Sequence, residues 1–252
     1  ATRAATGPSS GPASVPAASR PAASAGPLWL VLIGHGTFDG REAKFNLRGP
    51  DVSAAELADW LKPCRRPLAV IDCASASAPF LNALSGPGRV VVTATGSGGE
   101  NQFAHFGAYL SAAVGDPAAD LDKDGQTSLL EAFLAAAHGT EAFYKDAGRL
   151  ATEHALLDDT GDRLGTPAGW FKNVRATKSA KNGAEPDGRR AHQWHLVPTE
   201  AERALPADVR AKRDALELRV AALRDRKAAM PDAEYYGQLD ALLLELAKAY
   251  GP

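Results

Sequence analysis

Residues 68–80 read LAVIDCASASAPF, and this stretch decides the fold that we expect. An apolar run with β-branched residues ends at Asp72 and Cys73, and a series of small residues then leads to Pro79 and Phe80. A short apolar run bounded by small and turn-forming residues is typical of a buried strand in a parallel sheet. Open α/β sheets place their ligand sites at the carboxyl ends of such strands. Cys73 therefore stands at a position where a functional residue is expected.

A second apolar run, LWLVLIG at residues 28–34, ends at His35 and Gly36. If the two strands are parallel neighbours, His35 and Cys73 emerge on the same rim of the sheet. A thiol becomes a strong nucleophile only when a nearby base or cation favours the thiolate, so this pair has the composition of a catalytic dyad. The alternative is that Cys73 is a small buried apolar residue, which is the commoner role of a cysteine at a strand end.

Helices are expected to follow the strands. Ser53 and Glu56 have the spacing of a capping box, which predicts a helix to about Lys62. Its inward-facing residues should be Leu57, Trp60 and Leu61. A third buried strand is expected at 90–95, with a helix at 101–114 that buries Phe103, Phe106, Tyr109 and Leu110. Successive strand and helix units indicate an α/β fold with a mostly parallel sheet flanked by helices.

The chain divides into three parts. Residues 1–27 are almost entirely Ala, Pro, Ser, Gly and Thr, and we expect them to be disordered because they cannot bury enough apolar area. Residues 28–198 form the α/β domain. Residues 199–252 should form a helical hairpin of coiled-coil type, with helices at 207–229 and 233–250. The apolar stripe of the second helix should contain Tyr236, Leu239, Leu243, Leu246 and Tyr250. Self-association through this hairpin is one hypothesis.

Composition excludes several classes of function. The chain has 252 residues and a formal net charge of -2, which gives no reason to expect nucleic acid as a partner. No apolar run reaches the roughly 18 to 20 residues that a membrane span requires. The 2 cysteines are too few for a disulfide framework. The chain starts without Met and shows no signal peptide, so we expect a processed or excised product. The sequence does not assign its compartment, and export or a periplasmic location is among the alternatives.

The most specific local motif is DLDKDGQTSLLE at residues 120–131. It has the spacing of an EF-hand calcium loop, in which side chains and one backbone carbonyl converge on a hard cation and a glycine allows the sharp turn. The expected ligands are Asp120, Asp122, Asp124, the carbonyl of Gln126, Ser128 and Glu131, with Gly125 at the turn. The expected cofactor is therefore a structural Ca²⁺ ion.

Another interpretation of the same residues is an acidic loop before a helix, because Ser128 and Glu131 also form a capping box for a helix at 129–149. Thr127 stands where paired EF-hands usually place an aliphatic residue. Asp158, Thr160 and Asp162 repeat the first three spacings, but no acid closes that second loop. A single loop suggests structural calcium and not a paired sensor.

The late part of the α/β domain offers fewer signals. We expect a short strand at 193–197. His192 and His195 are separated by two residues, but no nearby Cys or acid in the sequence completes a metal set, so we interpret them as solvated or packing histidines.

The stretches LWLVLIGHGT at 28–37, IDC at 71–73 and VVVTAT at 90–95, with Glu100 and Phe103, resemble the caspase, metacaspase and legumain group of cysteine peptidases. The segments after Asp120 and from Glu153 to Asp159 look like those of bacterial legumain-like proteins. The resemblance covers about residues 28–172. It implies a caspase-like fold and hydrolysis of a peptide or protein substrate, with His35 as general base, Cys73 as nucleophile, and the amides of Gly36 and Cys73 as an oxyanion hole.

Two departures from the family pattern lead to an alternative. The family has an acid, one small residue and then Cys, whereas Cys73 directly follows Asp72 and Ala74 occupies the next position. A shift of one residue turns a strand side chain to the opposite face of the sheet. In addition, the family carries strands before the His35 strand, and without them that strand is an exposed edge. The two hypotheses are therefore a cysteine endopeptidase and a non-catalytic calcium-binding interaction module assembled through its C-terminal helices.

Overall fold

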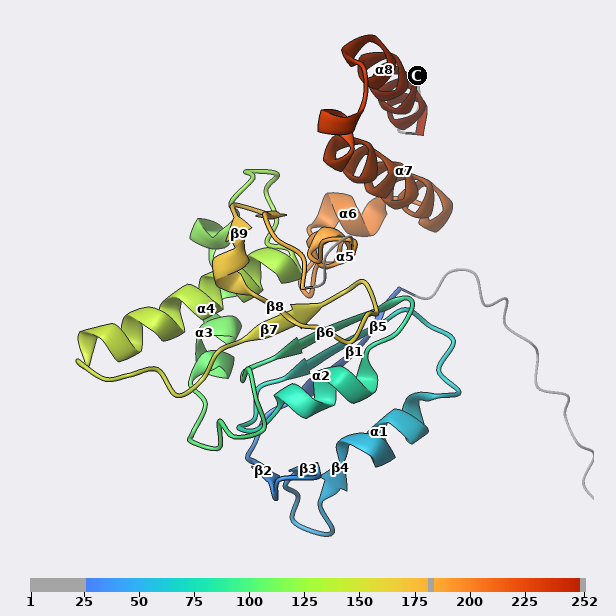
Figure 1. Cartoon of the computed structure of the whole chain (residues 1–252). Coiled ribbons are helices and arrows are strands. Elements are labelled where there is room, and N and C mark those ends of the chain that lie inside the picture. Colours follow the sequence, from blue (N-terminus) through green and yellow to red (C-terminus); the bar gives the residue numbers. More distant parts are fainter. Residues whose placement is uncertain (1–25, 181–183, 250–252) are drawn as a thin grey trace, which may run out of the picture.

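The computed structural model describes residues 26–180 and 184–249. It is an α/β structure in which a mixed five-stranded sheet has the order β1-β5-β6-β7-β8 and is flanked by helices (Figure 1). Disorder is expected for residues 1–27, and residues 1–25 of this segment lie outside the part of the chain that the structure describes.

Three of the strands are parallel and form the part of the sheet that the apolar runs predict. These strands are β1 (Leu28–Leu32), β5 (Leu68–Asp72) and β6 (Arg89–Thr93). Leu30 lies opposite Val70, and Val70 lies opposite Val91, so the carboxyl ends of all three strands meet at one rim. All five residues of β5 are buried, whereas β1 lies at the edge of the sheet and is only partly buried.

The other two strands run antiparallel, so the sheet is mixed and not mostly parallel. β7 (Leu156–Asp158) pairs antiparallel with β6, and β8 (Thr166–Pro167) pairs antiparallel with β7. The chain returns from the long helix α4 (Leu129–Asp146) in the opposite direction and enters β7 without a further crossover helix. These strands have 3 and 2 residues, too few for a periodic pattern to reveal their direction.

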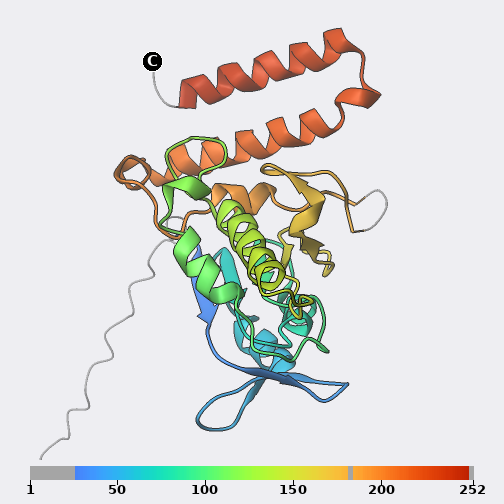
Figure 2. The same cartoon turned by 90° about the vertical axis from the view of Figure 1, so that its left-hand side faces the viewer.

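Helices cover both faces of the sheet (Figure 2). On one face lie α3 (Phe106–Ala113) and α4, which pack Phe106, Leu110 and Phe133 against the sheet. On the other face lie α1 (Ala54–Leu61) and α2 (Ala78–Leu84), which bury Leu57, Phe80 and Leu84. The residues of β5 alternate between these two cores, with Ile71 in the first and Val70 in the second.

The capping box that starts α1 is confirmed, because the Ser53 hydroxyl accepts from the Glu56 amide and the Glu56 carboxylate accepts from the Ser53 amide. The prediction that Trp60 faces inward is wrong, since this side chain is 62% exposed. The stripe that α1 turns to the core contains Ala54, Leu57, Ala58 and Leu61, at spacings of three and four residues, and Trp60 falls beside it.

The helix expected at 101–114 begins only at Phe106. The Glu153 carboxylate accepts hydrogen bonds from the amides of His105 and Phe106, which satisfies the first free donors of α3 at this point. The preceding residues form a loop, and Phe103, expected inside, is 63% exposed. The segment after His35 forms a separate three-stranded sheet of β2 (Gly36–Phe38), β3 (Ala43–Phe45) and β4 (Val52–Ser53).

Residues after β8 form short elements that pack on α4. They are η2 (Ala168–Trp170), the strand pair β9 (Phe171–Lys172) and β10 (Arg175–Ala176), and α5 (Arg189–Gln193). The strand expected at 193–197 is absent from this described segment, because Gln193 ends α5 and the Trp194 carbonyl accepts from the Leu129 amide at the start of α4.

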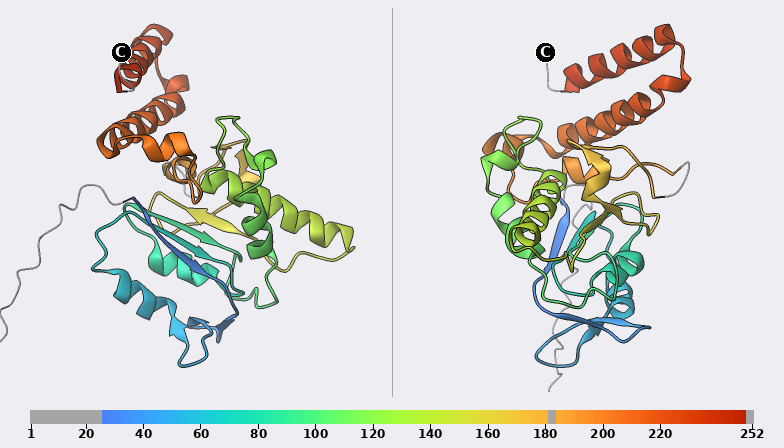
Figure 3. Two further views of the ribbon diagram at one scale, coloured as in Figure 1. Left: turned by 180° about the vertical axis from the view of Figure 1, so that it is seen from behind. Right: turned by 60° about the vertical axis from the view of Figure 1, so that its left-hand side comes forward.

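The C-terminal part is a helical hairpin beside the α/β domain (Figure 3). α6 (Glu200–Ala204) leads into α7 (Ala207–Asp225), and α8 (Asp232–Ala249) follows after the turn η3 (Lys227–Ala229). The side chains between α7 and α8 are Leu216, Val220, Leu223, Tyr235, Leu239, Leu242 and Leu246. The stripe of α8 is therefore rotated from the predicted one, and Tyr236 and Leu243 are exposed. No helix among the described residues is long and apolar enough to span a membrane.

Candidate functional site

The acidic loop lies between the 3₁₀ turn η1 (Pro117–Ala119) and the first turn of α4. Gly125 has φ +90°, a left-handed conformation that favours glycine, and Lys123 has φ +63°. The Asp120 carboxylate accepts from the Lys123 amide at 2.7 Å and from the Gly125 amide at 3.1 Å. The first aspartate and the glycine of the motif therefore hold the turn together.

Three carboxylates converge inside this loop. Asp120, Asp122 and Asp124 each place one oxygen so that the three oxygens lie within 4.8 Å of one another. Asp120 is buried, whereas Asp122 and Asp124 are exposed. Oxygen ligands from carboxylates at this mutual distance suit a hard cation such as Ca²⁺.

Glu131 closes the loop from α4 and is 1% exposed. Its Oε1 accepts from the amides of Leu121 and Asp122, and its Oε2 accepts from the amide and hydroxyl of Ser128. Ser128 in turn accepts from the Glu131 amide, so the capping box of α4 is present. The helix-capping interpretation is thus confirmed, and the same carboxylate stands at the twelfth position of the acidic loop.

Gln126 connects the loop to the C-terminal helices. Its side-chain oxygen accepts from the amide of Thr199 at 3.0 Å and from the hydroxyl of Thr199 at 3.1 Å. Thr199 is the N-cap residue of α6. The Gln126 side chain therefore links the acidic loop to the first turn of α6.

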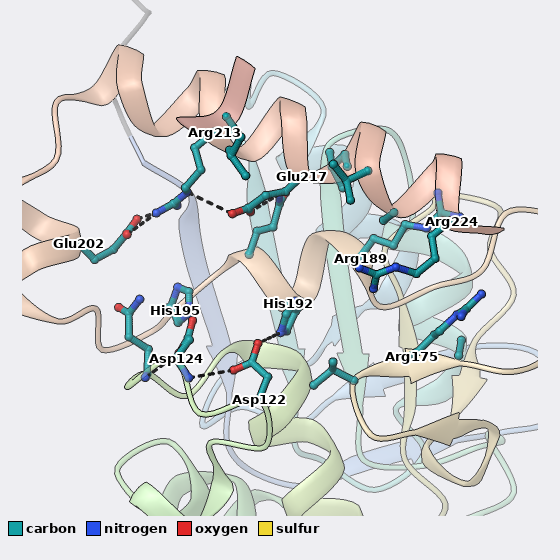
Figure 4. A pocket seen from close by; sticks show the side chains of 18 of the residues that line it. Asp122, Asp124, Arg175, Arg189, His192, His195, Glu202, Arg213, Glu217 and Arg224 are labelled. Atoms are coloured by element: carbon teal, nitrogen blue, oxygen red, sulfur yellow. Dashed lines mark hydrogen bonds and ion pairs between the residues drawn. The ribbon is translucent and has the colours of Figure 1, made fainter. Parts of the chain in front are cut away.

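His192 lies beside the acidic loop, a contact that the sequence did not reveal. Its Nε2 lies 3.1 Å from Asp122 Oδ2 (Figure 4). Together with Glu131, these two residues form a group whose ligand atoms lie within 4.8 Å of one another. Asp122 supplies the acidic partner that is missing among the residues close to His192 in the sequence. The two residues are 70 positions apart, so no local spacing could have revealed the contact.

The helix α5, which carries His192, is capped by a buried carboxylate. Asp159, on the loop after β7, accepts from the amides of Gly188, Arg190 and Ala191 and so caps the short helix α5. Burial raises the pKa of the Asp159 carboxyl, while these three amides lower it. These contacts hold the first turn of α5, the helix that carries His192.

A cavity of about 730 Å³ opens beside the loop, between α5 and the hairpin (Figure 4). Asp122, Asp124, His192 and His195 line one part of it. On the hairpin side, Arg213 and Glu202 form a buried ion pair. Burial lowers the pKa of His195, although Asp124 and Glu202 oppose this effect. The lining of the cavity thus contains charges of both signs, together with apolar residues such as Val220 and Leu246.

The second acidic repeat is used differently. Asp158 Oδ1 accepts from the amides of Thr160 and Gly161, and its Oδ2 accepts from the amide of Arg163. Ser85 donates to the same carboxylate. Asp158 therefore stabilises the turn between β7 and β8, and Asp162 caps the amide of Leu164 at the surface.

Cys73 lies in the core beneath α3 and is 7% exposed. A Cβ atom added at Gly107 would lie 2.8 Å from the Cys73 Cβ and 3.1 Å from its sulfur, so the helix backbone covers the thiol. Burial, assisted by the neighbouring Asp72 charge, raises the pKa of the Cys73 thiol to about 12. A thiol in this environment is protonated at neutral pH.

His35 is exposed and packs against Phe103, with ring centroids 6.0 Å apart. In the part of the chain that the structure describes, no hydrogen bond joins His35 to Cys73. Both amides expected to form an oxyanion hole have internal acceptors. The Gly36 amide donates to Ser75 Oγ at 3.1 Å, and the Cys73 amide donates to the Leu32 carbonyl at 2.9 Å.

The loop after β5 is held by buried hydroxyls. Ser75 also donates to the Gly36 carbonyl, and Ser77 and Thr95 exchange hydrogen bonds across the rim. A Cβ atom at Gly36 would lie 2.1 Å from the Ser75 carbonyl oxygen, which explains the glycine after His35 by close backbone approach. The small residues of the CASASA stretch are therefore buried and fill the space at this rim of the sheet.

Comparisons with known proteins give no relative for this chain. No protein-family model, curated protein or solved structure matches it.

Proposed function

We propose that this protein is a non-catalytic caspase-like domain that binds one calcium ion in the loop Asp120–Glu131. The observation that carries the proposal is the convergence of three carboxylate oxygens, from Asp120, Asp122 and Asp124, within 4.8 Å. Gly125 supplies the left-handed turn, and Glu131 stands at the closing position of the loop. These features agree with a hard oxygen site for Ca²⁺.

The proposal that the domain lacks peptidase activity rests on the rim of the sheet. A thiol whose pKa is about 12 is a poor nucleophile at neutral pH. The amides of Gly36 and Cys73 donate inside the fold and are not directed at a substrate. The caspase-like character itself is supported by parallel strands β1 and β5, whose carboxyl ends lead into His35 and Cys73.

Calcium would act structurally. The loop starts α4, contacts α5 through Asp122 and contacts α6 through Gln126. An ion bound to the aspartates neutralises their mutual repulsion and so stabilises the junction of these three helices. We therefore expect calcium to raise the melting temperature of the whole chain.

The test combines two measurements on the full chain. At a calcium concentration one hundred times the dissociation constant, the melting temperature should rise by about 5 to 10 °C over the value in EDTA. Asp124→Asn should remove this rise, and Asp162→Asn, which changes the matching position of the second repeat, should keep it. Peptide libraries should show no turnover. The proposal fails if calcium does not affect melting, or if turnover appears and disappears in both His35→Ala and Cys73→Ala.

A further inference from the structure

The cavity between α5 and the hairpin has a cationic end. Arg175, Arg189 and Arg224 line it there, and Figure 4 shows them to the right of the acidic loop. Asp225 is the carboxylate between them. Its Oδ1 accepts from Arg175 at 2.8 Å, and its Oδ2 accepts from Arg189. One carboxylate therefore lies among three guanidinium groups.

Other acids nearby do not balance this charge. Glu185 pairs with Arg189 from the rim, and its side chain is 62% exposed. Asp187 lines the cavity, but its carboxylate is bonded inside the fold, where the Thr166 hydroxyl donates to it. Among the ion pairs of the described residues, none includes Arg224. The Arg224 guanidinium therefore retains its capacity to bind an anion through two parallel hydrogen bonds.

A second cavity of about 470 Å³ adjoins this end and is also cationic. The two cavities share Arg175 and Asp225, and the second adds Lys172 and Lys178. Asp225 is the one carboxylate among its described lining residues. Two further cations therefore add to the positive potential at this end.

The lining next to the arginines is apolar. On α7, Val220 and Ala221 line the cavity one turn before Arg224. Val174 lines it beside Arg175, whose ion pair holds this segment against the same end of α7. An apolar surface therefore adjoins a cationic one, and sites for small molecules usually combine an apolar wall with a few polar groups.

Further along α7 the lining becomes acidic. Glu217 lines the cavity one turn before Ala221, and Asp122 and Asp124 line it at the acidic loop. These carboxylates disfavour a second anionic group on the same ligand. The lining therefore suits a ligand with one negative charge at one end of an apolar body.

We propose that this end of the cavity binds an organic monoanion with an apolar body, such as a medium-chain carboxylate. Its carboxylate pairs with Arg224, and its chain lies against Val220, Ala221 and Val174. A volume of about 730 Å³ accommodates a ligand of this size. The proposal is independent of calcium binding, because none of these residues belongs to the acidic loop.

Calorimetric titration of the full chain in EDTA tests the ligand class, and the chelator separates the outcome from calcium binding. Octanoate should bind at one site per chain. Three matched ligands should each bind at least about tenfold more weakly. They are acetate, which has the charge without the chain, 1-octanol, which has the chain without the charge, and suberate, which adds a second carboxylate. Absence of octanoate binding, or equal binding of any of the other three, overturns the proposal.

Two pairs of variants locate the ligand. Arg224→Gln should weaken octanoate binding at least about tenfold. Arg226→Gln removes the same charge from an exposed residue that is not among the described lining residues, and it should bind normally. Ala221→Gln places a polar side chain in the apolar part and should also weaken binding, whereas Ala215→Gln, at an exposed residue of the same helix, should not.

Arg224 is exposed, so Arg224→Gln should melt like the wild type, which separates a loss of binding from a loss of folding. Unchanged octanoate binding in both Arg224→Gln and Ala221→Gln overturns the proposal. An equal loss in Arg224→Gln and Arg226→Gln also overturns it, because that result would indicate a general effect of charge and not a site.

Discussion

Cys73 lies directly beneath Gly107, close enough that a Cβ atom on Gly107 would come within 2.8 Å of the Cys73 Cβ. The thiol therefore belongs to the core between the sheet and α3, although its sequence position at a strand end resembles that of a nucleophile. The contact explains why α3 needs glycine at its second residue. It also makes the reactivity of this thiol a direct probe of the fold.

We expect Cys73 to resist alkylation. In a Cys64→Ser variant, a thiol pKa of about 12 lowers the thiolate fraction at pH 7 by about a thousandfold relative to a free cysteine. His35→Ala should leave the rate unchanged, because the Cys73 thiol is buried, the His35 side chain is exposed, and no hydrogen bond joins them in the described part of the chain. Cys64, which is only half-buried, should label rapidly in a Cys73→Ala variant and serves as the reference. Rapid labelling of Cys73 that depends on His35 would instead indicate an activated dyad.

Ser75→Ala should destabilise the fold by about 1 to 3 kcal/mol. The substitution leaves the buried Gly36 amide without its acceptor, and an unsatisfied buried donor costs about this much. Denaturant unfolding measures the change. Ser97→Ala, at an exposed serine of the neighbouring loop, should alter the free energy of unfolding by less than about 0.5 kcal/mol. A similar small effect for Ser75→Ala would mean that the rim does not depend on this hydroxyl.

Asp72→Asn should stabilise the protein at neutral and alkaline pH. Burial raises the pKa of the Asp72 carboxyl from 3.8 to about 7, and the Ala74 amide only partly opposes this effect. Because the folded pKa lies above the unfolded one, stability decreases as pH rises from about 4 to 7 and then stays low. The rise in pKa corresponds to about 4 kcal/mol. Asn can still accept from the Ala74 amide, so the substitution should remove this slope.

Unfolding by denaturant between pH 4 and pH 8 checks this prediction. The free energy of unfolding of Asp72→Asn should exceed that of the wild type at pH 8 and approach it at pH 4. Asp162→Asn, at the surface, should follow the wild-type curve. Parallel curves for Asp72→Asn and the wild type would show that Asp72 ionises without penalty.

His192→Gln should weaken calcium binding about tenfold without abolishing it. His192 contacts Asp122 at 3.1 Å and orients this carboxylate, and loss of such a partner typically costs 10- to 100-fold in metal affinity. His138→Gln, at an exposed histidine of α4, is the control and should bind calcium normally. Complete loss of binding in His192→Gln would indicate that the imidazole is itself a ligand.

Local patterns predicted the parallel part of the fold well. The apolar run of β5, the capping boxes of α1 and α4, and the left-handed glycine of the acidic loop all depend on neighbours within a few residues. The direction of β7 and the start of α3 depend on distant groups instead. Glu153 caps α3 across 48 residues, and no period in the sequence reports such a contact.

The candidate site shows the same division. The spacing of Asp120, Asp122 and Asp124 could be recognised in the sequence, whereas the contact of Asp122 with His192 required the fold. The side to which the Cys73 thiol turns depends on the alternation of β5 between two cores, so a resemblance over a few residues could not determine it.

Isothermal titration of the full chain with Ca²⁺, after removal of bound ions by a chelator, tests the central claim most directly. We predict one ion bound per chain in the wild type and in Asp162→Asn, and no binding in Asp124→Asn. Mg²⁺ should compete weakly, because it demands a smaller octahedral site. A wild-type chain that binds no calcium, or an Asp124→Asn variant that binds it unchanged, would contradict the assignment of the loop Asp120–Glu131 as a calcium site.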